Sequence, residues 1–305
     1  MLEWKPLTLD DRLVVSDYLQ QYPPQVSEHT FTNLFIWGEH RTVRFAEVDD
    51  TLLVMVERNG RRSLHGPPVG PQRVSQLMDA LEESGIHRFE RIPERTAQEL
   101  NTLGLVTKED RDNSDYVYRQ RDLAELRGRR YHRQKNLINR CVSRNECRYC
   151  EITIDMLDEV AQMQDRWCDE RDCGKDRGLC AEYRAIRRML GDYEELRARG
   201  AAVRVGDRIE AFTMGEALNP STAVIHFEKA MAGIPGLYQV INKWFVKRDL
   251  EEFEFVNREQ DLGIPGLRQA KESYSPDHMT VKYVAAFEPA NLEPLVSPAE
   301  GRCPE

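Results

Sequence analysis

The chain has 305 residues, of which 40% are hydrophobic and 31% charged, with a formal net charge of -9. This length exceeds one small domain, and the supply of apolar side chains excludes a largely disordered chain. The acidic balance argues against a protein that coats nucleic acid non-specifically, because such binding needs surplus Lys and Arg. Apolar runs such as Leu52–Val56 fall far short of the roughly 20 residues of a membrane-spanning helix, so none is expected.

The stretch up to Ile92 predicts two helices, three strands, a helix and a strand, in that order. The helices are expected over Thr8–Gln21 and from Ser27-Glu28 onward, and the strands over Thr42–Ala46, Leu52–Arg58 and Ser63–His65, followed by a helix over Pro71–Gly85 and a strand over Arg88–Ile92.

The same order of elements returns after Cys150. It comprises a helix with Leu157, Val160, Met163 and Trp167, a helix over Tyr183–Leu196, strands over Ala202–Val205, Arg208–Ala217 and Ser221–Lys229, a helix over Leu237–Leu250, and a closing strand over Phe253–Asn257. The turns Val48-Asp49-Asp50 and Val205-Gly206-Asp207 occupy matching places. Element order is repeated, whereas residue identity is not.

This order resembles the N-acyltransferase superfamily, and its duplication resembles the aminoacyl-tRNA-dependent transferases. We therefore predict an α/β (α+β) fold of two tandem acyl-CoA N-acyltransferase-like domains, each a mixed, mostly antiparallel sheet flanked by helices. The expected divisions are a scaffold domain over residues 1–120, a basic connecting helix over 121–146, a catalytic domain over 147–288 and a flexible tail over 289–305.

A glycine-containing loop lies where this superfamily binds an anionic group at a helix N-terminus. Acetyl-CoA users carry Gln/Arg-x-x-Gly-x-Gly/Ala there, whereas this chain reads Lys229-Ala-Met-Ala-Gly-Ile-Pro-Gly. The proline removes one backbone donor, which disfavours CoA. Gly233 and Gly236 are predicted to bind substrate, and the alternative is a strand-to-helix turn that needs small residues.

A second segment narrows the family. From Asp261 the chain reads Asp-Leu-Gly-Ile-Pro-Gly-Leu-Arg-Gln-Ala-Lys-Glu-Ser-Tyr-Ser-Pro. It resembles the C-terminal catalytic domain of phosphatidylglycerol lysyltransferases, where an Asp-Leu-Gly turn and a Leu-Arg-x-x-Lys-x-x-aromatic-x-Pro run precede a basic-Tyr strand. The matching positions are Leu267, Arg268, Lys271, Tyr274, Pro276 and Lys282-Tyr283. The two motifs are further apart in those enzymes, so the loop between them is shortened here.

Weaker likeness to the same family extends over Tyr116-Val-Tyr, Gly128-Arg-Arg-Tyr-His and Phe255-Val-Asn257. The resemblance implies a relative that lacks the membrane-embedded portion and takes its donor from aminoacyl-tRNA.

Aminoacyl transfer builds negative charge on a carbonyl oxygen, which a fixed cation stabilises. The resemblance implicates Lys271, and on a helix Lys271 and Tyr274 share a face. Asp261 is predicted either to hold an incoming amine or to cap the following turn. All three are candidate catalytic residues.

Glu228 ends a predicted strand where the superfamily often keeps a general base, and His226 falls on the same face by alternation. Burial of this carboxylate would favour a base, and the alternative is an ion pair with Lys229 or a neighbour. Asn257, Tyr238 and Arg268 are candidate substrate-binding residues.

Residues 127–144 hold seven basic side chains and no acidic one. In a helix, Arg129, Arg133, Arg140 and Arg144 fall within about 60° of one another, and Tyr131, Ile138 and Val142 lie opposite. This pattern predicts a cationic ridge for tRNA phosphates or anionic lipid head groups, with a solvated inter-domain helix as the alternative.

The N-terminus lacks the pattern of a secretion signal, so we expect a cytoplasmic protein with peripheral contact at the inner membrane surface and with reduced cysteines. Cys147-x-x-Cys150 has Cys168, Cys173 and Cys180 as potential partners, but a second CxxC pair is missing. We predict no metal site.

The predicted function is transfer of an amino acid from a charged tRNA to a lipid head group, a peptide or a small molecule, without a cofactor. Two alternatives remain at this point. One is an acyl-CoA-dependent N-acyltransferase, and the other is a non-catalytic binding module that keeps the fold.

Overall fold

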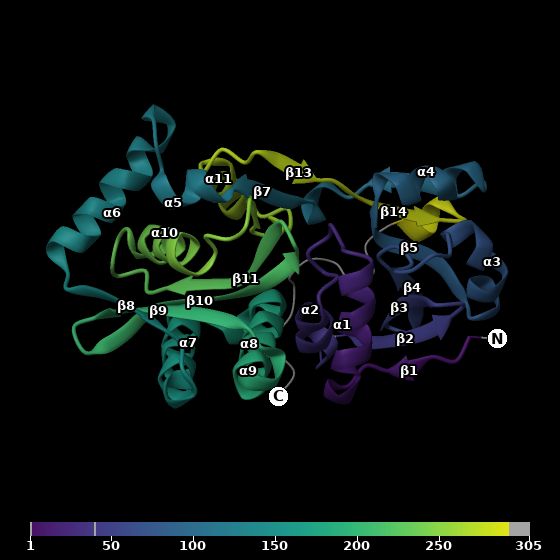
Figure 1. The fold of residues 1–305 in the computed structure, drawn as a ribbon, viewed down its shortest axis with the longest axis horizontal. Helices are drawn as coiled ribbons and strands as arrows, with labels where there is room; N and C mark the ends of the chain where they lie inside the picture. The colour runs from purple at the N-terminus through teal and green to yellow at the C-terminus, as the bar shows by residue number, and fades with distance from the viewer. Residues whose placement is uncertain (1, 40, 293–305) are drawn as a thin grey trace. The chain divides into compact units, whose positions relative to one another are not determined.

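The protein is described here by a computed structural model that covers residues 2–39 and 41–292. These residues form two compact units, each built on a 7-stranded sheet (Figure 1). Among the described residues, the first unit takes those up to 115 together with 260–265 and 279–292, and the second takes 116–259 and 266–278. Helices flank both sheets, as predicted.

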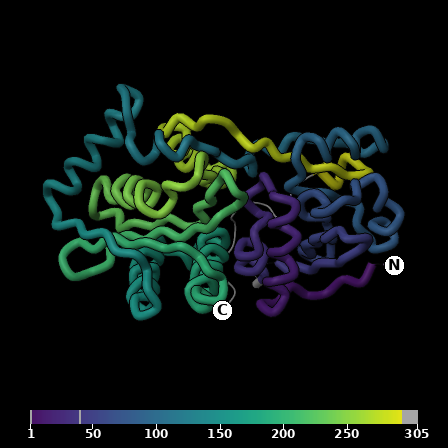
Figure 2. The backbone as a smooth tube through the Cα atoms, viewed as in Figure 1, coloured from purple at the N-terminus to yellow at the C-terminus, as the bar shows by residue number. Residues whose placement is uncertain are grey.

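The first sheet has the strand order β1-β2-β3-β4-β5-β14-β6. Neighbouring strands are antiparallel except for the parallel pair β4 and β5. The strands are β1 (Lys5–Pro6), β2 (Thr42–Val48), β3 (Thr51–Arg58), β4 (Arg61–His65), β5 (Ile86–Pro93), β6 (Val106–Glu109) and β14 (Lys282–Ala286). Figure 2 shows the C-terminal segment, in yellow, beside the blue strands of this unit.

The position of β14 differs from the contiguous domain ranges expected from the sequence, because β14 lies between β5 and β6 of the first sheet. Its first residue explains this placement. Lys282 is completely buried, and its Nζ lies 2.5 Å from Glu28 and 2.6 Å from Asp115. A buried ammonium requires such carboxylates, so the charge pairing helps to fix the strand in this unit.

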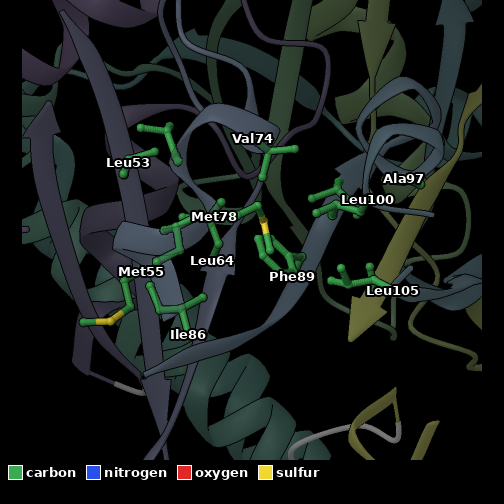
Figure 3. Packing of buried hydrophobic residues seen from close by; sticks show 14 residues of the cluster. Leu53, Met55, Leu64, Val74, Met78, Ile86, Phe89, Ala97, Leu100 and Leu105 are labelled. Carbon is green, nitrogen blue, oxygen red and sulfur yellow. The ribbon is translucent and has the colours of Figure 1, made fainter. Parts of the chain in front are cut away.

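The helical elements of the first unit cover its sheet. They are α1 (Arg12–Gln21), α2 (Phe31–Ile36), α3 (Val74–Glu83) and α4 (Glu94–Thr102), with 3-10 turns η1 (Leu9–Asp11), η2 (Trp37–Glu39), η3 (Arg111–Asn113) and η7 (Pro289–Leu292). The apolar core lies between the sheet and helices α3 and α4, where Leu53, Leu64 and Phe89 pack with Val74 and Leu100 (Figure 3).

The second sheet has the order β13-β7-β12-β11-β10-β9-β8. Its strands are β7 (Asp115–Arg119), β8 (Cys147–Glu151), β9 (Arg199–Val205), β10 (Arg208–Asn219), β11 (Thr222–Ala230), β12 (Phe255–Asn257) and β13 (His278–Thr280). Strands β11 and β12 are parallel, whereas the pairs β8 with β9, β9 with β10, and β10 with β11 are antiparallel. The parallel pair is the feature that positions the candidate site.

Helices pack on both faces of the second sheet, with α10 on one and α7 and α8 on the other (Figure 1). The helical elements are α5 (Gln120–Glu125), η4 (Arg129–Tyr131), α6 (His132–Arg144), η5 (Ile154–Met156), α7 (Leu157–Arg171), η6 (Cys173–Lys175), α8 (Arg177–Gly191), α9 (Tyr193–Leu196), α10 (Leu237–Asp249) and α11 (Pro265–Glu272).

Two helix starts differ from their predictions. The second helix begins at Phe31 rather than at Ser27-Glu28, because Thr30 is its N-cap and accepts from Asn33 N. Ser27 instead bonds Asp115 through its backbone N–H and hydroxyl, and Glu28 pairs with Lys282. The helix predicted over Tyr183–Leu196 starts earlier, at Arg177, where the Asp176 side chain caps it.

The basic segment is not one continuous helix. Helix α5 ends at Glu125, and Leu126 and Gly128 have φ values of 52° and 89°, so a new helix starts only at His132. Val142 lies opposite the arginines in sequence periodicity, but 41% of this residue is exposed, so it does not share the packed face with Tyr131 and Ile138. Gln134, Ile138 and Cys141 are the buried residues of α6.

The expectation of reduced cysteines is also corrected, because Cys168 and Cys173 form a disulfide. Cys168 lies in α7 and Cys173 lies in η6, so the disulfide links the end of one helix to the start of the next. Cys147 and Cys150 are free thiols. Of the predicted tail over 289–305, residues 289–292 form η7, and the rest lies outside the described residues.

Candidate active site at the diverging strands of the second sheet

Strands β11 and β12 diverge after a short parallel stretch. Their pairing covers Thr222–Val224 against Phe255–Asn257, whereas β11 continues to Ala230. The chain turns away after β12, where Asn257 Oδ1 accepts from Glu259 N at 2.7 Å. The divergence leaves the end of β11 facing side chains instead of a neighbouring strand on this side.

Glu228 and Arg258 bridge this divergence. Arg258 Nη2 donates to Glu228 Oε1 at 2.9 Å, and Asn242 Nδ2 of α10 donates to Glu228 Oε2 at 2.8 Å. The predicted ion pair of Glu228 therefore exists, but its partner is Arg258. Lys229 points to the opposite face, pairs with Glu182 at 2.6 Å and lies 3.9 Å above the Trp167 ring.

Arg258 is held between two tyrosines. Its guanidinium carbon lies 4.8 Å from the ring centre of Tyr274 and 5.7 Å from that of Tyr118. Burial raises the pKa of both phenols, so both stay neutral. In the described part of the chain, Arg258 Nη1 and Asn242 Oδ1 are buried without a hydrogen-bond partner. One donor and one acceptor are thus unsatisfied on the two groups that hold Glu228.

A second bridge crosses the divergence beside the first. His226 lies between two carboxylates, with Nε2 2.8 Å from Glu216 and Nδ1 2.8 Å from Glu259. Burial alone would lower the pKa of His226, but the two carboxylates outweigh burial and raise it to about 10. The imidazolium is therefore charged at neutral pH, and it is a poor general base.

Lys271 is buried in α11, and its ammonium donates to backbone carbonyls. Nζ bonds the carbonyl oxygen of Arg258 and lies 3.3 Å from that of Glu259. The Tyr118 hydroxyl donates to the carbonyl oxygen of Lys271 at 2.8 Å. Lys271 thus holds the segment that carries Arg258, and Tyr274, three residues later, packs on the same guanidinium.

Asp261 belongs to the first unit and is completely buried. Its Oδ1 accepts from Gly263 N at 2.8 Å, and its Oδ2 lies 3.1 Å from Arg111. These contacts match the predicted turn cap. The contacts are those of a residue that shapes the Asp-Leu-Gly turn.

The loop before α10 is shaped by packing. Gly236 has φ 95°, and a Cβ there would lie 2.4 Å from the carbonyl oxygen of Leu137 in α6. Gly233 has open space around it. The Tyr238 hydroxyl accepts from Trp167 Nε1 at 3.0 Å, and Arg268 is half-buried in α11.

The predicted cationic ridge is exposed on η4 and α6, where Arg129, Arg133, Arg140 and Arg144 lie at the surface. Helix α10 adds further positive charge nearby. Burial lowers the pKa of Lys243 in α10, and the positive charges of Lys247 and Lys135 lower it further. Lys135 of α6 and Lys243 of α10 are thus close enough for their charges to interact, and the exposed cations of η4, α6 and α10 are together called the cationic surface.

Five residues of the cluster are not among the predicted site residues, namely Tyr118, Glu216, Asn242, Arg258 and Glu259. One signal was available, because Arg258 and Glu259 directly follow the closing strand, and polar residues at the carboxyl ends of parallel strands often line a site. The others come from elements distant in sequence.

Within the described ranges, no group of three or more His, Cys, Asp and Glu side chains is arranged to hold a metal ion. In the same ranges, no helix is both long and apolar enough to cross a bilayer.

Two helix-flanked mixed sheets, each containing a parallel strand pair, define a tandem N-acyltransferase fold. The family described as "Phosphatidylglycerol lysyltransferase, C-terminal" matches residues 19–286, and the chain belongs to this family. The resemblance predicted from the sequence is thereby confirmed.

Solved structures agree with this assignment. A conserved protein of unknown function from Bacteroides thetaiotaomicron is 30% identical, with a TM-score of 0.88 over 94% of this chain and 100% of that one. The C-terminal domain of a putative lysylphosphatidylglycerol synthetase from Agrobacterium fabrum is 17% identical, with a TM-score of 0.70 over 93% of each chain. L-PGS from Bacillus licheniformis is 15% identical, with a TM-score of 0.65 over 90% of this chain and 91% of that one. No protein with a curated description matches.

Proposed function

We propose that the protein transfers an aminoacyl group from aminoacyl-tRNA to an amine or hydroxyl acceptor, at the site formed by Glu228, Asn242 and Arg258. The unsatisfied pair beside Glu228 carries this proposal. Arg258 Nη1 is a buried donor, and Asn242 Oδ1 is a buried acceptor. An aminoacyl ester offers their complements, a carbonyl oxygen and an amino group. Family membership supports the same reaction class.

In this proposal the amine or hydroxyl of the acceptor attacks the ester carbonyl carbon, the acceptor's proton passes to water, and negative charge develops on the carbonyl oxygen. Arg258 Nη1 donates to that oxygen, and its stabilisation is strongest in the transition state. The bond from the carbonyl carbon to the tRNA oxygen then breaks, and that oxygen takes up a proton from water, so the number of protons is conserved. Lys271 acts as a positioning residue, because its ammonium bonds the Arg258 carbonyl.

The cationic surface of α6 and α10 is the proposed landing site for tRNA. Its exposed arginines can pair with phosphates, which releases counterions and makes binding depend on salt. Reversing Arg133 and Arg140 to Glu should weaken tRNA binding and flatten the salt dependence, measured by filter binding at several salt concentrations. Unchanged affinity would remove this surface from the proposal. The lipid head group implied by the family remains one candidate acceptor among several.

The transfer reaction is tested by incubating the full chain with a mixture of charged tRNAs, with and without lipid extract, and measuring which esters are consumed. Arg258→Gln should lower consumption by about 100-fold or more, as for loss of one oxyanion donor. Arg177→Gln, an exposed arginine at the start of α8, is the matched control and should leave the rate unchanged.

Three results would contradict the proposal. The first is that no ester is consumed with any acceptor, and the second is that Arg258→Gln retains full activity. The third is a thermal shift with CoA together with acyl transfer from acyl-CoA, which would favour the CoA-dependent alternative. The packing of Gly236 on Leu137 gives no support to that alternative.

A further inference from the structure

The first unit contains a polar region that the proposed transfer reaction does not use. It lies on the sheet face opposite the apolar core. Thr42 of β2 pairs with Glu57 of β3, so the register places the preceding Arg41 next to Arg58 at the ends of these strands. The register of β4 and β5 places His65 opposite Glu90. Burying this many ionisable groups is costly unless their charges are matched.

The charges in this region are not matched. Lys282 has Glu28 and Asp115 as partners, and Arg91 has Glu28 at 3.0 Å and Asp110 at 2.6 Å. Arg58 and Arg88 share Glu90 at 3.8 and 3.9 Å, beyond hydrogen-bonding range.

Arg41 lacks even such a distant partner among the side chains that the structure describes, residues 39 and 40 excluded, because none of their carboxylates lies within 4.0 Å of it, although only 8% of the residue is exposed. Its Nη2 reaches Asn33 Oδ1 at 3.4 Å, and its Nε is buried without a partner. Burial, with Arg58 as the largest electrostatic contribution, lowers the pKa of Arg41 to about 9. Among the described side chains, Glu90 is therefore the one carboxylate within 4.0 Å of any of the three largely buried guanidinium groups, those of Arg41, Arg58 and Arg88.

Two imidazoles beside these arginines each have one unprotonated ring nitrogen that can accept a hydrogen bond. His29 Nε2 lies 2.7 Å from the carbonyl oxygen of His65, so it carries the hydrogen and leaves Nδ1 as an acceptor. His65 Nδ1 lies 3.0 Å from Glu90, so it donates and leaves Nε2 as an acceptor. Both bare nitrogens are buried and have no partner among the described residues. They would accept from a hydroxyl or amino group.

We propose that this region of the first unit binds a small oxyanion, a carboxylate or a phosphate, whose ligand also carries a hydroxyl or amino group. The oxyanion lies against Arg41, where it supplies the missing negative charge, and the hydroxyl or amino hydrogen reaches His29 or His65. Arg58, whose side chain is 18% exposed, marks the side open to solvent. This site does not depend on the transfer reaction proposed for the second unit.

The test is calorimetric titration of the full chain at constant ionic strength with three probes: inorganic phosphate, glycerol 3-phosphate and lactate. The wild-type protein should bind at least one of them saturably, and the preferred probe distinguishes phosphate from carboxylate. Arg41→Gln should weaken that binding at least about tenfold, because a charge-assisted bond is lost. The exposed Arg61→Gln is the matched control and should bind as the wild type does.

Arg258→Gln separates the two proposals, because it disables the second unit's site and should leave anion binding intact. If Arg41→Gln does not fold, Arg41→Lys keeps the charge, lacks the guanidinium and should still bind more weakly. The proposal is overturned if no probe binds saturably, if the Arg41 variants bind as tightly as the wild type, or if Arg258→Gln abolishes binding.

Discussion

Each of the two units buries a histidine against a carboxylate, yet one imidazole is neutral and the other is positively charged. His65 in the first unit meets Glu90, but burial, with Arg41 as the next contribution, lowers its pKa to about 3. His226 in the second unit meets Glu216 and Glu259, which overcome burial and raise its pKa to about 10. A carboxylate neighbour alone therefore does not decide protonation. The balance of all charges within reach decides it.

This difference separates the chemistry of the two sheets. The first unit has surplus cations around neutral imidazoles, as expected of a site that receives an anion. The second unit has surplus carboxylates around an imidazolium, and that salt bridge holds the diverging strands beside Arg258. Four experiments test this contrast, given in order of decreasing expected effect.

The largest effect is expected from Lys282→Met, which removes the cation that neutralises Glu28 and Asp115. Despite burial, the charge of Lys282 helps to lower the pKa of Glu28 to about 2, so the variant leaves the buried Glu28 carboxylate without its closest cation. Stability should fall by about 3–5 kcal/mol, measured by urea unfolding. Lys108→Met, an exposed lysine of β6, is the control. A loss equal to that of the control would mean that the buried ion pairs of Lys282 do not stabilise the folded protein.

The next largest effect is a loss of folding stability at alkaline pH. Folding raises the pKa of His226 from 6.5 to about 10, so its contribution is fully present below pH 6.5 and is lost as the pH rises through 10. Between pH 6.5 and 9.5 the unfolding free energy should fall by about 4 kcal/mol more in the wild type than in His226→Gln. Parallel pH profiles for the two proteins would show that His226 is not charged in the folded state.

The first unit should respond in the opposite direction. Folding lowers the pKa of His65 from 6.5 to about 3, so the protein loses stability as the pH falls below 6.5. Relative to His65→Gln, the wild type should lose about 3 kcal/mol between pH 6.5 and 4, measured by urea unfolding across that range. A wild type that resists acid as well as the variant does would contradict the assignment of neutral His65.

The smallest effect concerns the loop before α10. Gly236→Ala should destabilise the protein by about 1–3 kcal/mol, because the new Cβ meets Leu137 and φ is positive. Gly233→Ala has open space and should be nearly neutral in the same thermal unfolding assay. If instead Gly233→Ala weakened substrate binding and Gly236→Ala were harmless, the loop would serve a ligand rather than packing.

The sequence was sufficient for the fold class, because apolar periodicity and turn residues are local signals. Strand β11 and helix α10 lie close to their predicted ranges for this reason. The pairing of Glu228 with Arg258 was not predictable in the same way. It depends on where β12 stops pairing with β11, which is a long-range property.

The interruption of the predicted basic helix could not be predicted from the sequence either. The positive φ at Leu126, a residue that rarely adopts it, interrupts the basic helix without a proline or an unfavourable charge to announce it. The surplus positive charge around Arg41 was invisible for another reason, because its members come from five separate elements or loops of the first unit.

The place of β14 also bears on synthesis. A nascent chain that has emerged from the ribosome only as far as residue 281 contains nearly all of the second unit, but the first sheet still lacks the strand between β5 and β6. Glu28 and Asp115 cannot form their ion pairs with Lys282 until that residue has been synthesised. Vectorial translation therefore delivers the last strand of the first sheet after nearly all of the second unit, and this strand pairs with residues distant in sequence.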